Sequence, residues 1–514
     1  MSIACFVELL PSGRRIPVVA GTDLKEILFA EGFEFPCAGR EECGRCRVRV
    51  LQGAPAPSEK EQRLLSVEEL RDGWRLGCRI EVVEPLTLEL PPCNTPILAD
   101  DTPINFPGRV GKGAVIDLGT TTLVAQLIDL KSSQILGTET ALNPQVIIST
   151  ELIGRILYAI EEQGGLEELT LVLRQRVGEL VTRFVRADST DNNELKLILI
   201  SGNTVMHHLF SGLAVDGLAT TPFTPTDTAA VSLSLPELGW DLPGTPEIVV
   251  LPCLGGFVGS DTLAGVLATR IGERQELSAL IDLGTNGEVV VGNREGLLCA
   301  STAAGPSFEG GRVSMGMRAA SGAIDSVDLL QDEFRCHVIG DTAPRGICGS
   351  GLLDAVAAGL TSGRITPSGR FGDSRQELML EPPVKITQRD VRELQLAKGA
   401  IASALECLLE ELGAEDGDLH RVYLAGAFGH RLRAQSAVRI GLLPVGAEKI
   451  RAVGNTALFG TRLALFEPDL PARLQSLRDR IQHIPLNEAS RFEETFVRQL
   501  NFPDRNIIDR EELS

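Results

Sequence analysis

The 514-residue chain has few aromatic residues and a shortage of positive charge. Trp, Tyr and Phe together make up 4% of it, and 49 Lys and Arg face 69 Asp and Glu, which gives a formal net charge of −20. A nucleic-acid-binding protein needs a basic face against phosphates. We therefore expect no nucleic-acid partner.

The chain also lacks long hydrophobic runs. No apolar run approaches the roughly 18 residues that a membrane span needs. The start, MSIACFVELL, has neither the basic segment nor the small-residue cleavage site of a signal peptide. These absences predict a cytoplasmic protein without a membrane partner. The 53 glycines are plentiful by contrast, which suits tight loops close to a ligand.

Four of the eleven cysteines have a spacing that indicates a metal centre: Cys37, Cys43, Cys46 and Cys78. Clustered cysteines in a cytoplasmic chain point to metal before disulfides. Zinc sites usually present two C-x2-C pairs. One gap of five, one gap of two and a distant fourth cysteine are instead typical of a [2Fe–2S] loop. The spacing predicts that these four thiolates ligate iron, with zinc as the alternative.

The flanking segments resemble a plant- or adrenodoxin-type ferredoxin. Residues 4–19 predict a hairpin that turns at Pro11-Ser12-Gly13, residues 22–32 a helix, and residues 74–90 returning strands. The gap of five between the first two cysteines is similar to the adrenodoxin variant. We predict an α+β ferredoxin (β-grasp) domain at 1–90, followed by a proline-rich linker at 91–110.

The five residues Ile-Asp-Leu-Gly-Thr occur twice, at 116–120 and at 281–285, each time after an apolar strand. Gly permits close approach to phosphate, and amides and hydroxyls donate hydrogen bonds to it. An Asp at the strand end can hold Mg²⁺ through water. Two such loops would clamp the polyphosphate of ATP from both sides. The candidates are Asp117, Gly119, Thr120 and Thr121 in the first loop, and Asp282, Gly284, Thr285 and Asn286 in the second.

This arrangement resembles the superfamily of actin, sugar kinases and heat-shock-chaperone ATPases. The resemblance implies a two-lobed α/β actin-like ATPase with nucleotide in the cleft between the lobes. A small-residue helix (255–271), a strand and turn (421–432) and a second small-residue helix (453–465) follow in the expected order. We place lobe I at 111–275, lobe II at 276–452, and a return helix with a C-terminal segment at 453–514. Gly426 and Gly429 are expected to meet the nucleoside.

The general base is predicted from position. Asp261 opens the first small-residue helix, where relatives in this superfamily place an acidic or amide residue. An Asp there is equally compatible with a helix N-cap. Glu288 is the second candidate.

Several further stretches complete a closer resemblance: LISGNTVMHHLF, STAAGPSFEGG, GMRAASGAI, GICGSGLLDAV, ITQRDVRELQLAKGAI and RFEETFVRQLNFP. With the leading cysteine module they resemble the reductive activators of corrinoid proteins. This implies ATP-dependent, one-electron reduction of inactive Co(II) corrinoid protein to Co(I) through the [2Fe–2S] cluster. The implied partners are a corrinoid methyl carrier and a low-potential electron donor, and a homodimer is also considered.

The resemblance also implies why the reaction would need ATP. Plant-type clusters lie near roughly −400 mV. If the Co(II)/Co(I) couple lies about 100–200 mV lower, electron transfer is uphill by roughly 2–5 kcal/mol. ATP binding could supply that difference by favouring one complex over another.

Two departures and two rival functions remain open. After NPQ at 143–145, Ser149 and Glu151 stand where the family usually has Gly and Asp, and the linker replaces a small domain of longer members. One rival is a nucleotide-dependent redox sensor or chaperone that delivers no electron. The other is an activator of a dehydratase or aromatic-ring reductase, whose [4Fe–4S] cluster bridges a dimer without an N-terminal ferredoxin. The remaining cysteines and the pair His207 and His208 are expected to be structural.

Overall fold

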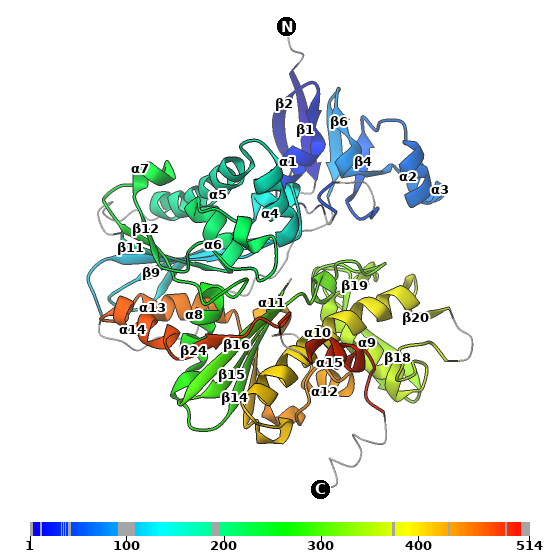
Figure 1. Ribbon diagram of the computed structural model, residues 1–514. Helices are drawn as coiled ribbons and strands as arrows, with labels where there is room; N and C mark the ends of the chain where they lie inside the picture. Colours follow the sequence, from blue (N-terminus) through cyan, green and yellow to red (C-terminus); the bar gives the residue numbers. More distant parts are fainter. Residues whose placement is uncertain are drawn as a thin grey trace.

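The computed structural model describes residues 4–10, 13–31, 33, 35, 37–39, 43–90, 108–187, 195–284, 286–372, 376–429, 432–488 and 491–504. A small N-terminal domain, in blue, lies against a first α/β lobe in cyan and green, with a second lobe in green to orange below them (Figure 1). Most of the predicted linker falls outside the described residues. None of the helices in these ranges has the length and apolar character to span a lipid bilayer.

The N-terminal domain is a five-stranded sheet in the order β2-β1-β7-β4-β5, with α1 packed on it. The predicted hairpin is confirmed, since β1 and β2 pair antiparallel, and β7 runs parallel to β1. The predicted return at 74–90 is less regular than expected, because a 3-10 turn that carries Cys78 separates its strands. The elements are β1 (Ala4–Leu10), β2 (Arg14–Val19), β3 (Thr22–Asp23), α1 (Leu24–Ala30), β4 (Arg47–Gln52), α2 (Glu59–Leu64), α3 (Val67–Arg71), β5 (Trp74–Leu76), η1 (Gly77–Arg79), β6 (Glu81–Val82) and β7 (Leu86–Glu89).

Lobe I is built on a six-stranded sheet in the order β10-β9-β8-β11-β13-β12. The first three strands form an antiparallel meander, and β11 and β13 run parallel to β8. The elements are β8 (Lys112–Leu118), β9 (Thr122–Asp129), β10 (Ile135–Leu142), η2 (Pro144–Ile147), α4 (Leu152–Glu161), α5 (Gly165–Ala187), β11 (Leu195–Gly202), α6 (Thr204–Ser211), η3 (Asp216–Leu218), β12 (Val231–Leu233), α7 (Leu235–Leu238), β13 (Glu247–Val250), α8 (Ser260–Thr269) and η4 (Ile271–Glu273).

Lobe II repeats this topology. Its main sheet has the order β23-β22-β14-β15-β16-β24, with an antiparallel β14-β15-β16 meander and with β22 and β23 parallel to β14. The elements are β14 (Ser278–Leu283), β15 (Gly287–Asn293), β16 (Gly296–Thr302), η5 (Pro306–Glu309), β17 (Ala323–Leu330), β18 (Glu333–Val338), β19 (Gly346–Ile347), α9 (Gly349–Thr361), β20 (Glu377–Glu381), β21 (Val384–Thr387), α10 (Gln388–Glu411), η6 (Asp416–Asp418), β22 (Arg421–Ala425), α11 (Gly426–Gly429), α12 (Ala434–Arg439), η7 (Ala447–Lys449), β23 (Ile450–Gly454), α13 (Thr456–Ala464), α14 (Leu470–Arg478), β24 (Ile481–His483) and α15 (Phe492–Gln499).

The repeated Ile-Asp-Leu-Gly-Thr therefore marks a repeated architecture. Each copy follows the first strand of a sheet into its loop, from β8 in lobe I and from β14 in lobe II, and five strands of the two sheets have the same order. The sixth strand differs, because β12 lies beside β13 and β24 lies beside β16. The predicted fold class, a ferredoxin followed by a two-lobed actin-like ATPase, is confirmed.

Two helices with small residues lie between the two sheets. A Cβ on Gly460 of α13 would stand 1.8 Å from the carbonyl oxygen of Ala264 in α8, so only glycine permits this crossing. Around them, one hydrophobic cluster joins side chains of both sheets, from Val115 and Leu199 to Leu280 and Val290. Small residues therefore permit the two helices to pack closely between the sheets.

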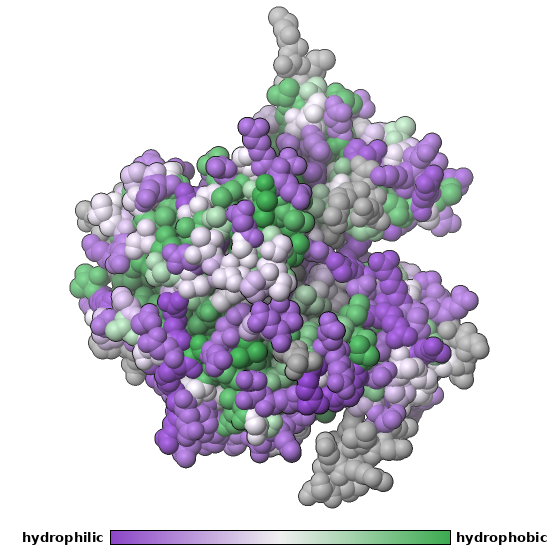
Figure 2. All heavy atoms as spheres, viewed as in Figure 1, coloured by the Kyte–Doolittle hydropathy of each residue, from purple (hydrophilic) through white to green (hydrophobic). Residues whose placement is uncertain are grey.

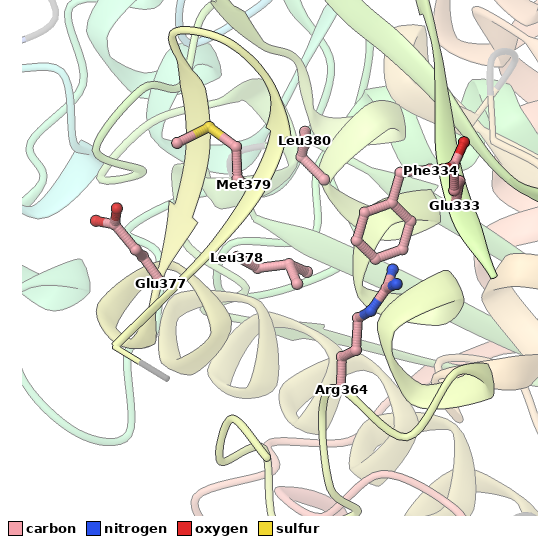
Figure 3. Close-up of a pocket in the computed structure, with 7 residues that line it drawn as sticks. All are labelled: Glu333, Phe334, Arg364, Glu377, Leu378, Met379 and Leu380. Atoms are coloured by element: carbon pink, nitrogen blue, oxygen red, sulfur yellow. The ribbon is translucent and has the colours of Figure 1, made fainter. Parts of the chain in front are cut away.

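Lobe II carries a peripheral insertion of small sheets, β17–β19 and β20–β21. A cavity of about 480 Å³ lies between β18 and β20 (Figure 3). The guanidinium carbon of Arg364 lies 4.6 Å from the ring centre of Phe334 at its edge. The cavity contains none of the predicted site residues. Figure 2 shows mostly hydrophilic side chains over the ferredoxin end and the right-hand side of lobe II, with more hydrophobic ones over lobe I.

Candidate functional site

The four predicted iron ligands lie in the ferredoxin domain, in a loop and in a turn that face each other. Cys37 and Cys46 are buried, Cys43 is half-buried, and Cys78 belongs to the 3-10 turn after β5. Positive φ angles at Ala38 (52°), Gly39 (79°) and Gly44 (63°) bend the loop around them. Gly44 and Gly39 fit this left-handed backbone without strain.

The thiols are arranged in two pairs. The Sγ atoms of Cys46 and Cys78 lie 3.2 Å apart, and Cys43 interacts with Cys37. The neighbouring thiol and burial together raise the pKa of both Cys43 and Cys46, because each pair shares protons that a metal would displace. A [2Fe–2S] centre has two irons, and two thiolates per iron is the arrangement that such a centre requires. Zinc needs four ligands around one point, and among the described residues no three such side chains, these cysteines included, are close enough to hold one ion. The paired thiols therefore fit a [2Fe–2S] cluster better than a zinc ion.

Four carboxyl groups from the two lobes lie close enough together to interact electrostatically. They belong to both lobes: Asp117 ends β8, Asp261 lies in the first turn of α8, Asp282 ends β14, and Glu288 lies on β15. Asp282 and Glu288 are direct cross-strand neighbours. Like charges in this position repel each other. The cleft is thus a site of concentrated negative charge.

Burial raises the pKa of all four carboxyl groups, and repulsion from neighbouring carboxylates adds to the rise for Asp261, Asp282 and Glu288. The pKa of Asp117 rises to about 6, mainly through burial, although a hydrogen bond from Asn455 opposes the rise. Burial, followed by repulsion from the other carboxylates, raises the pKa of Asp261 and Asp282 to about 7. Burial and then repulsion from Asp261 and Asp282 also raise the pKa of Glu288 well above its ordinary value. A cation in this cleft would relieve the repulsion and displace protons.

The carboxylates are not packed around a single point. Within the described ranges, no three Asp, Glu, His or Cys side chains are close enough together to hold one metal ion. Mg²⁺ characteristically keeps several waters and is bound through one or two carboxylates and substrate phosphates. The spacing fits that mode of binding and not an all-protein cage.

Two asparagines hold the first loop in the same way. Asn203 accepts a bond from Met206 N through Oδ1, which caps α6, and donates from Nδ2 to Thr120 Oγ1 at 3.1 Å. Asn455 caps α13 through Leu458 N and donates to Asp117 Oδ2 at 2.8 Å. Both lie in a Gly-Asn-Thr sequence, at 202–204 and 454–456. The repetition of this triplet was the signal that could have identified them.

Buried side chains also fix the backbone of the first loop from behind. Asn143 Nδ2 donates to Gly119 O at 3.0 Å, and Arg155 Nη2 donates to Thr120 O at 2.5 Å. Both side chains are fully buried, and burial lowers the pKa of Arg155 to about 9. From lobe II, Arg318 Nη1 donates to Thr122 Oγ1 at 3.4 Å. Sequence reasoning missed these three residues, because their contacts with the loop are long-range.

The second loop has other surroundings. Thr285 lies outside the described residues. A Cβ on Gly284 would have only Asn286 O near it, at 3.6 Å, so protein packing does not require glycine there. Gly426, with φ of 86°, borders this loop, since a Cβ would stand 2.7 Å from Asp282 Oδ1. Gly429 lies behind it, in the short helix α11 next to Leu424.

The two candidate bases have different local partners. Asp261 is not the N-cap of α8, which is Gly259, but its Oδ1 accepts a bond from Thr262 N at 2.7 Å. Glu288 accepts a bond from Ser301 Oγ at 3.2 Å. Both side chains belong to the carboxylate cluster, and their roles in a reaction stay predictions.

The residues predicted to be structural are buried. His207 Nδ1 lies 3.1 Å from Leu251 O, and His208 Nδ1 lies 2.8 Å from Thr204 O. Cys93 falls outside the described ranges. The other cysteines without metal spacing are buried or half-buried in the core: Cys5, Cys253, Cys299, Cys336, Cys348 and Cys407.

Comparison with known protein families matches three consecutive parts of the chain. Residues 7–83 match the 2Fe-2S iron-sulfur cluster binding domain, residues 112–274 the RACo middle region, and residues 276–513 the C-terminal domain of RACo, the ASKHA domain. These matches support a [2Fe–2S] cluster in the first domain and nucleotide binding in the last.

Individual relatives agree over most of the chain. It is 34% identical to "Corrinoid activation enzyme RamQ" of Eubacterium limosum over 80% of this chain and 74% of that protein. It is 28% identical to "[Co(II) methylated amine-specific corrinoid protein] reductase" of Methanosarcina barkeri over 69% and 70%. A solved structure named "Reductive activator for corrinoid,iron-sulfur protein" superposes with a TM-score of 0.68 and 25% identity, over 97% of this chain and 98% of that one. The chain belongs to the family of reductive activators of corrinoid proteins.

Proposed function

We propose that this chain reduces a corrinoid protein from Co(II) to Co(I), one electron at a time, in a reaction that depends on ATP. The observation that carries the proposal is the presence, in one chain, of a ferredoxin domain with paired thiols and of two lobes that carry the same five-residue loop after their first strand. The names of the relatives point to the same reaction.

The thiols of Cys37, Cys43, Cys46 and Cys78 hold the cluster in this proposal. A [2Fe–2S] cluster supplies one-electron transfer at a low potential. Burial of three of the four side chains excludes water and keeps the dielectric constant around the sulfurs low. The half-buried Cys43 marks the side on which the site is most open to a partner.

ATP binds in the cleft between the two loops. Gly119, Thr120 and Thr121 donate to phosphate oxygens from lobe I, and Gly284 and Asn286 do so from lobe II, with Thr285 expected to join them. Asp117 and Asp282 orient the water shell of Mg²⁺, whose charge offsets the carboxylate repulsion. Gly426 and Gly429 border the nucleoside end.

Asp261 serves as the general base for hydrolysis. Its pKa of about 7 leaves it partly ionised at neutral pH, which suits a group that takes a proton from water. Burial and the charges of Asp261 and Asp282 raise the pKa of Glu288 well above its ordinary value, and Glu288 is the second candidate.

The partner is a corrinoid methyl carrier whose cobalt has been oxidised to Co(II). The electron comes from a low-potential donor protein in the cytoplasm. A homodimer is compatible with this proposal, and the reaction itself needs one copy of the chain.

The test uses a methylated-amine-specific corrinoid protein in the Co(II) state, a strong reductant and Mg-ATP. We expect its Co(II) absorbance to decay to that of Co(I), and omission of ATP to leave most of it as Co(II). Cys43→Ser should still bind ATP but reduce no cobalt, and Asp117→Ala should keep the cluster but lose the ATP-dependent reaction. If both variants reduce cobalt as the parent does, the chain is a sensor or chaperone and not a reductase.

A further inference from the structure

The hydrophobic core of the ferredoxin domain extends into lobe I. Its hydrophobic core includes Leu142 and Val146 of lobe I, which are 8% and 5% exposed, and Ile147 packs against the same core. These residues end β10 and form η2, the short turn that follows it. We call residues 142–147 the bridging turn.

The other side of the bridging turn contacts the first phosphate loop. Asn143 N donates to Thr121 O at 2.9 Å, and Asn143 Nδ2 donates to Gly119 O at 3.0 Å. The carbonyl between them, on Thr120, accepts from Arg155, which also donates to Gln145 Oε1 at 3.0 Å. Three consecutive carbonyls of the phosphate loop are thus tied to the bridging turn through fully buried polar groups.

The cysteine loop has a second contact, with lobe II. Arg45, between Cys43 and Cys46, donates from Nη2 to Gly310 O at 2.9 Å, at the end of η5. Two residues further on, Arg312 forms an ion pair with Glu151 at the start of α4, directly after the bridging turn. The ferredoxin domain therefore contacts lobe I through its core and lobe II through its cluster loop.

We propose that the bridging turn transmits nucleotide binding to the cluster, with Asn143 and Arg155 as positioning residues. Nucleotide binding closes two-lobed proteins about a hinge. When one side of a close-packed interface is displaced slightly, the packed segments move together as a rigid unit and do not deform gradually. When bound phosphates displace residues 119–121, the bridging turn moves with these residues, and the ferredoxin core moves with the turn. The hydrogen bond of Arg45 meanwhile keeps the cluster loop attached to lobe II. The loop between Cys43 and Cys46 therefore responds to the angle between the lobes.

This inference rests on the proposed function, because it needs both a cluster and ATP in one chain. It is distinct from a purely structural role for the buried network. A network that only kept the phosphate loop in shape would alter ATP affinity and leave the cluster's response to ATP unchanged. The cluster's response is therefore the deciding observation.

The experiment compares Val146→Ala with Val181→Ala in the full chain. Both valines are buried in lobe I, but Val181 belongs to the lobe core on α5 and Val146 to the ferredoxin core. Val146 is not part of the nucleotide site. The reduced cluster is observed by electron paramagnetic resonance with and without Mg-AMPPNP. Hydrogen exchange of the turn amides, including Val146 N and Ile148 N, gives a readout independent of the cluster.

We expect Mg-AMPPNP to shift the spectrum of the parent and to slow exchange at the turn. Val181→Ala should keep the shift, and Val146→Ala should lose at least half of it while its iron content stays the same and its Kd for the nucleotide stays within about twofold. Ile147→Ala serves as the second variant if Val146→Ala does not fold. Arg45→Ala should reduce the shift without altering exchange at the turn.

Three results would overturn the assignment. The first is an unchanged shift in Val146→Ala and Ile147→Ala. The second is an equal loss in both the bridging-turn variants and Val181→Ala, which would indicate general destabilisation. The third is a parent that hydrolyses ATP and reduces cobalt without any nucleotide-dependent shift. That outcome leaves the proposed function in place, whereas failure to bind the nucleotide at all rejects both.

Discussion

The two repeated loops share five residues but differ in what surrounds them. Both loops have three residues between their strands, at 119–121 and 284–286, but the strands pair in different registers. Leu118 pairs with Leu123 across four residues in lobe I, and Leu283 pairs with Gly287 across three in lobe II. As a result Asp282 stands opposite Glu288, whereas Asp117 stands opposite Val124. The register of lobe II therefore places Glu288 beside Asp282, whereas β9 of lobe I has no acidic residue before Asp129.

The supports of the loops differ as well. Side chains from four other segments hold the first loop and Asp117: Asn143, Arg155, Asn203 and Asn455. In the described part of the second loop, Gly284 N donates a hydrogen bond to Asn286 O at 3.0 Å, which is a bond within the loop itself. The first loop is thus held in place by other segments and joined to the ferredoxin domain, and the second loop is flanked by the neighbouring carboxyl groups of Asp282 and Glu288. The same sequence motif therefore has different structural surroundings in the two lobes.

The largest effect is expected from removing either loop's aspartate. Asp117→Ala and Asp282→Ala should each lower ATP hydrolysis by about 100-fold or more, because each takes a carboxylate from the metal's surroundings. Steady-state phosphate release measures this. A variant that hydrolyses ATP at the parent rate would show that its loop is not part of the clamp.

The carboxylate cluster predicts a pH dependence of stability in the absence of Mg²⁺. The pKa of Asp261 is about 7 in the folded protein and 3.8 as its ordinary value, so the folded state binds more protons between these values. Stability should therefore fall as the pH rises from about 4 to 7 and level off above that. Urea unfolding at several pH values measures the slope.

Asp261→Asn should flatten this slope and raise the free energy of unfolding at pH 8 by roughly 1–3 kcal/mol, at about 1.4 kcal/mol for each pKa unit. Saturating Mg-ATP should flatten it in the parent too, by neutralising the charge. A parent whose stability rises over the same pH range would contradict the repulsion that raises these pKa values.

A smaller effect separates the two tasks of the loop asparagines. Serine also caps a helix but cannot reach the phosphate loop. Asn203→Ser and Asn455→Ser should therefore weaken ATP binding by roughly 3- to 10-fold, the value of one hydrogen bond, with little change in stability. Asp469→Ser, at the N-cap of α14 away from the cleft, is the control and should bind ATP like the parent. Calorimetric titration compares the three.

The sequence predicted the architecture because the architecture repeats. The doubled loop, the small-residue helices and the cysteine spacing each depend on local chemistry that can be read in a few consecutive residues. The Asp282–Glu288 pair could also have been predicted, had the strand register been considered.

The bridging turn could not be predicted in this way. Val146 looks like any apolar residue after a strand, and nothing local indicates that the ferredoxin core covers it. Arg155 likewise lies on an amphipathic helix, where an arginine ordinarily faces solvent, yet it is fully buried under the phosphate loop. Such contacts between distant segments are fixed by tertiary packing and leave no periodic trace.

The most direct measurement of the central claim is a single turnover. The cluster is reduced first, the excess reductant is removed, and the protein is mixed with the Co(II) methylated-amine-specific corrinoid protein. With Mg-ATP, we expect one Co(I) for each reduced cluster, with cluster oxidation and cobalt reduction at the same rate; without ATP, most of the cobalt should stay Co(II). Equal cobalt reduction without ATP, or cluster oxidation that produces no Co(I), would contradict an ATP-dependent transfer through this cluster.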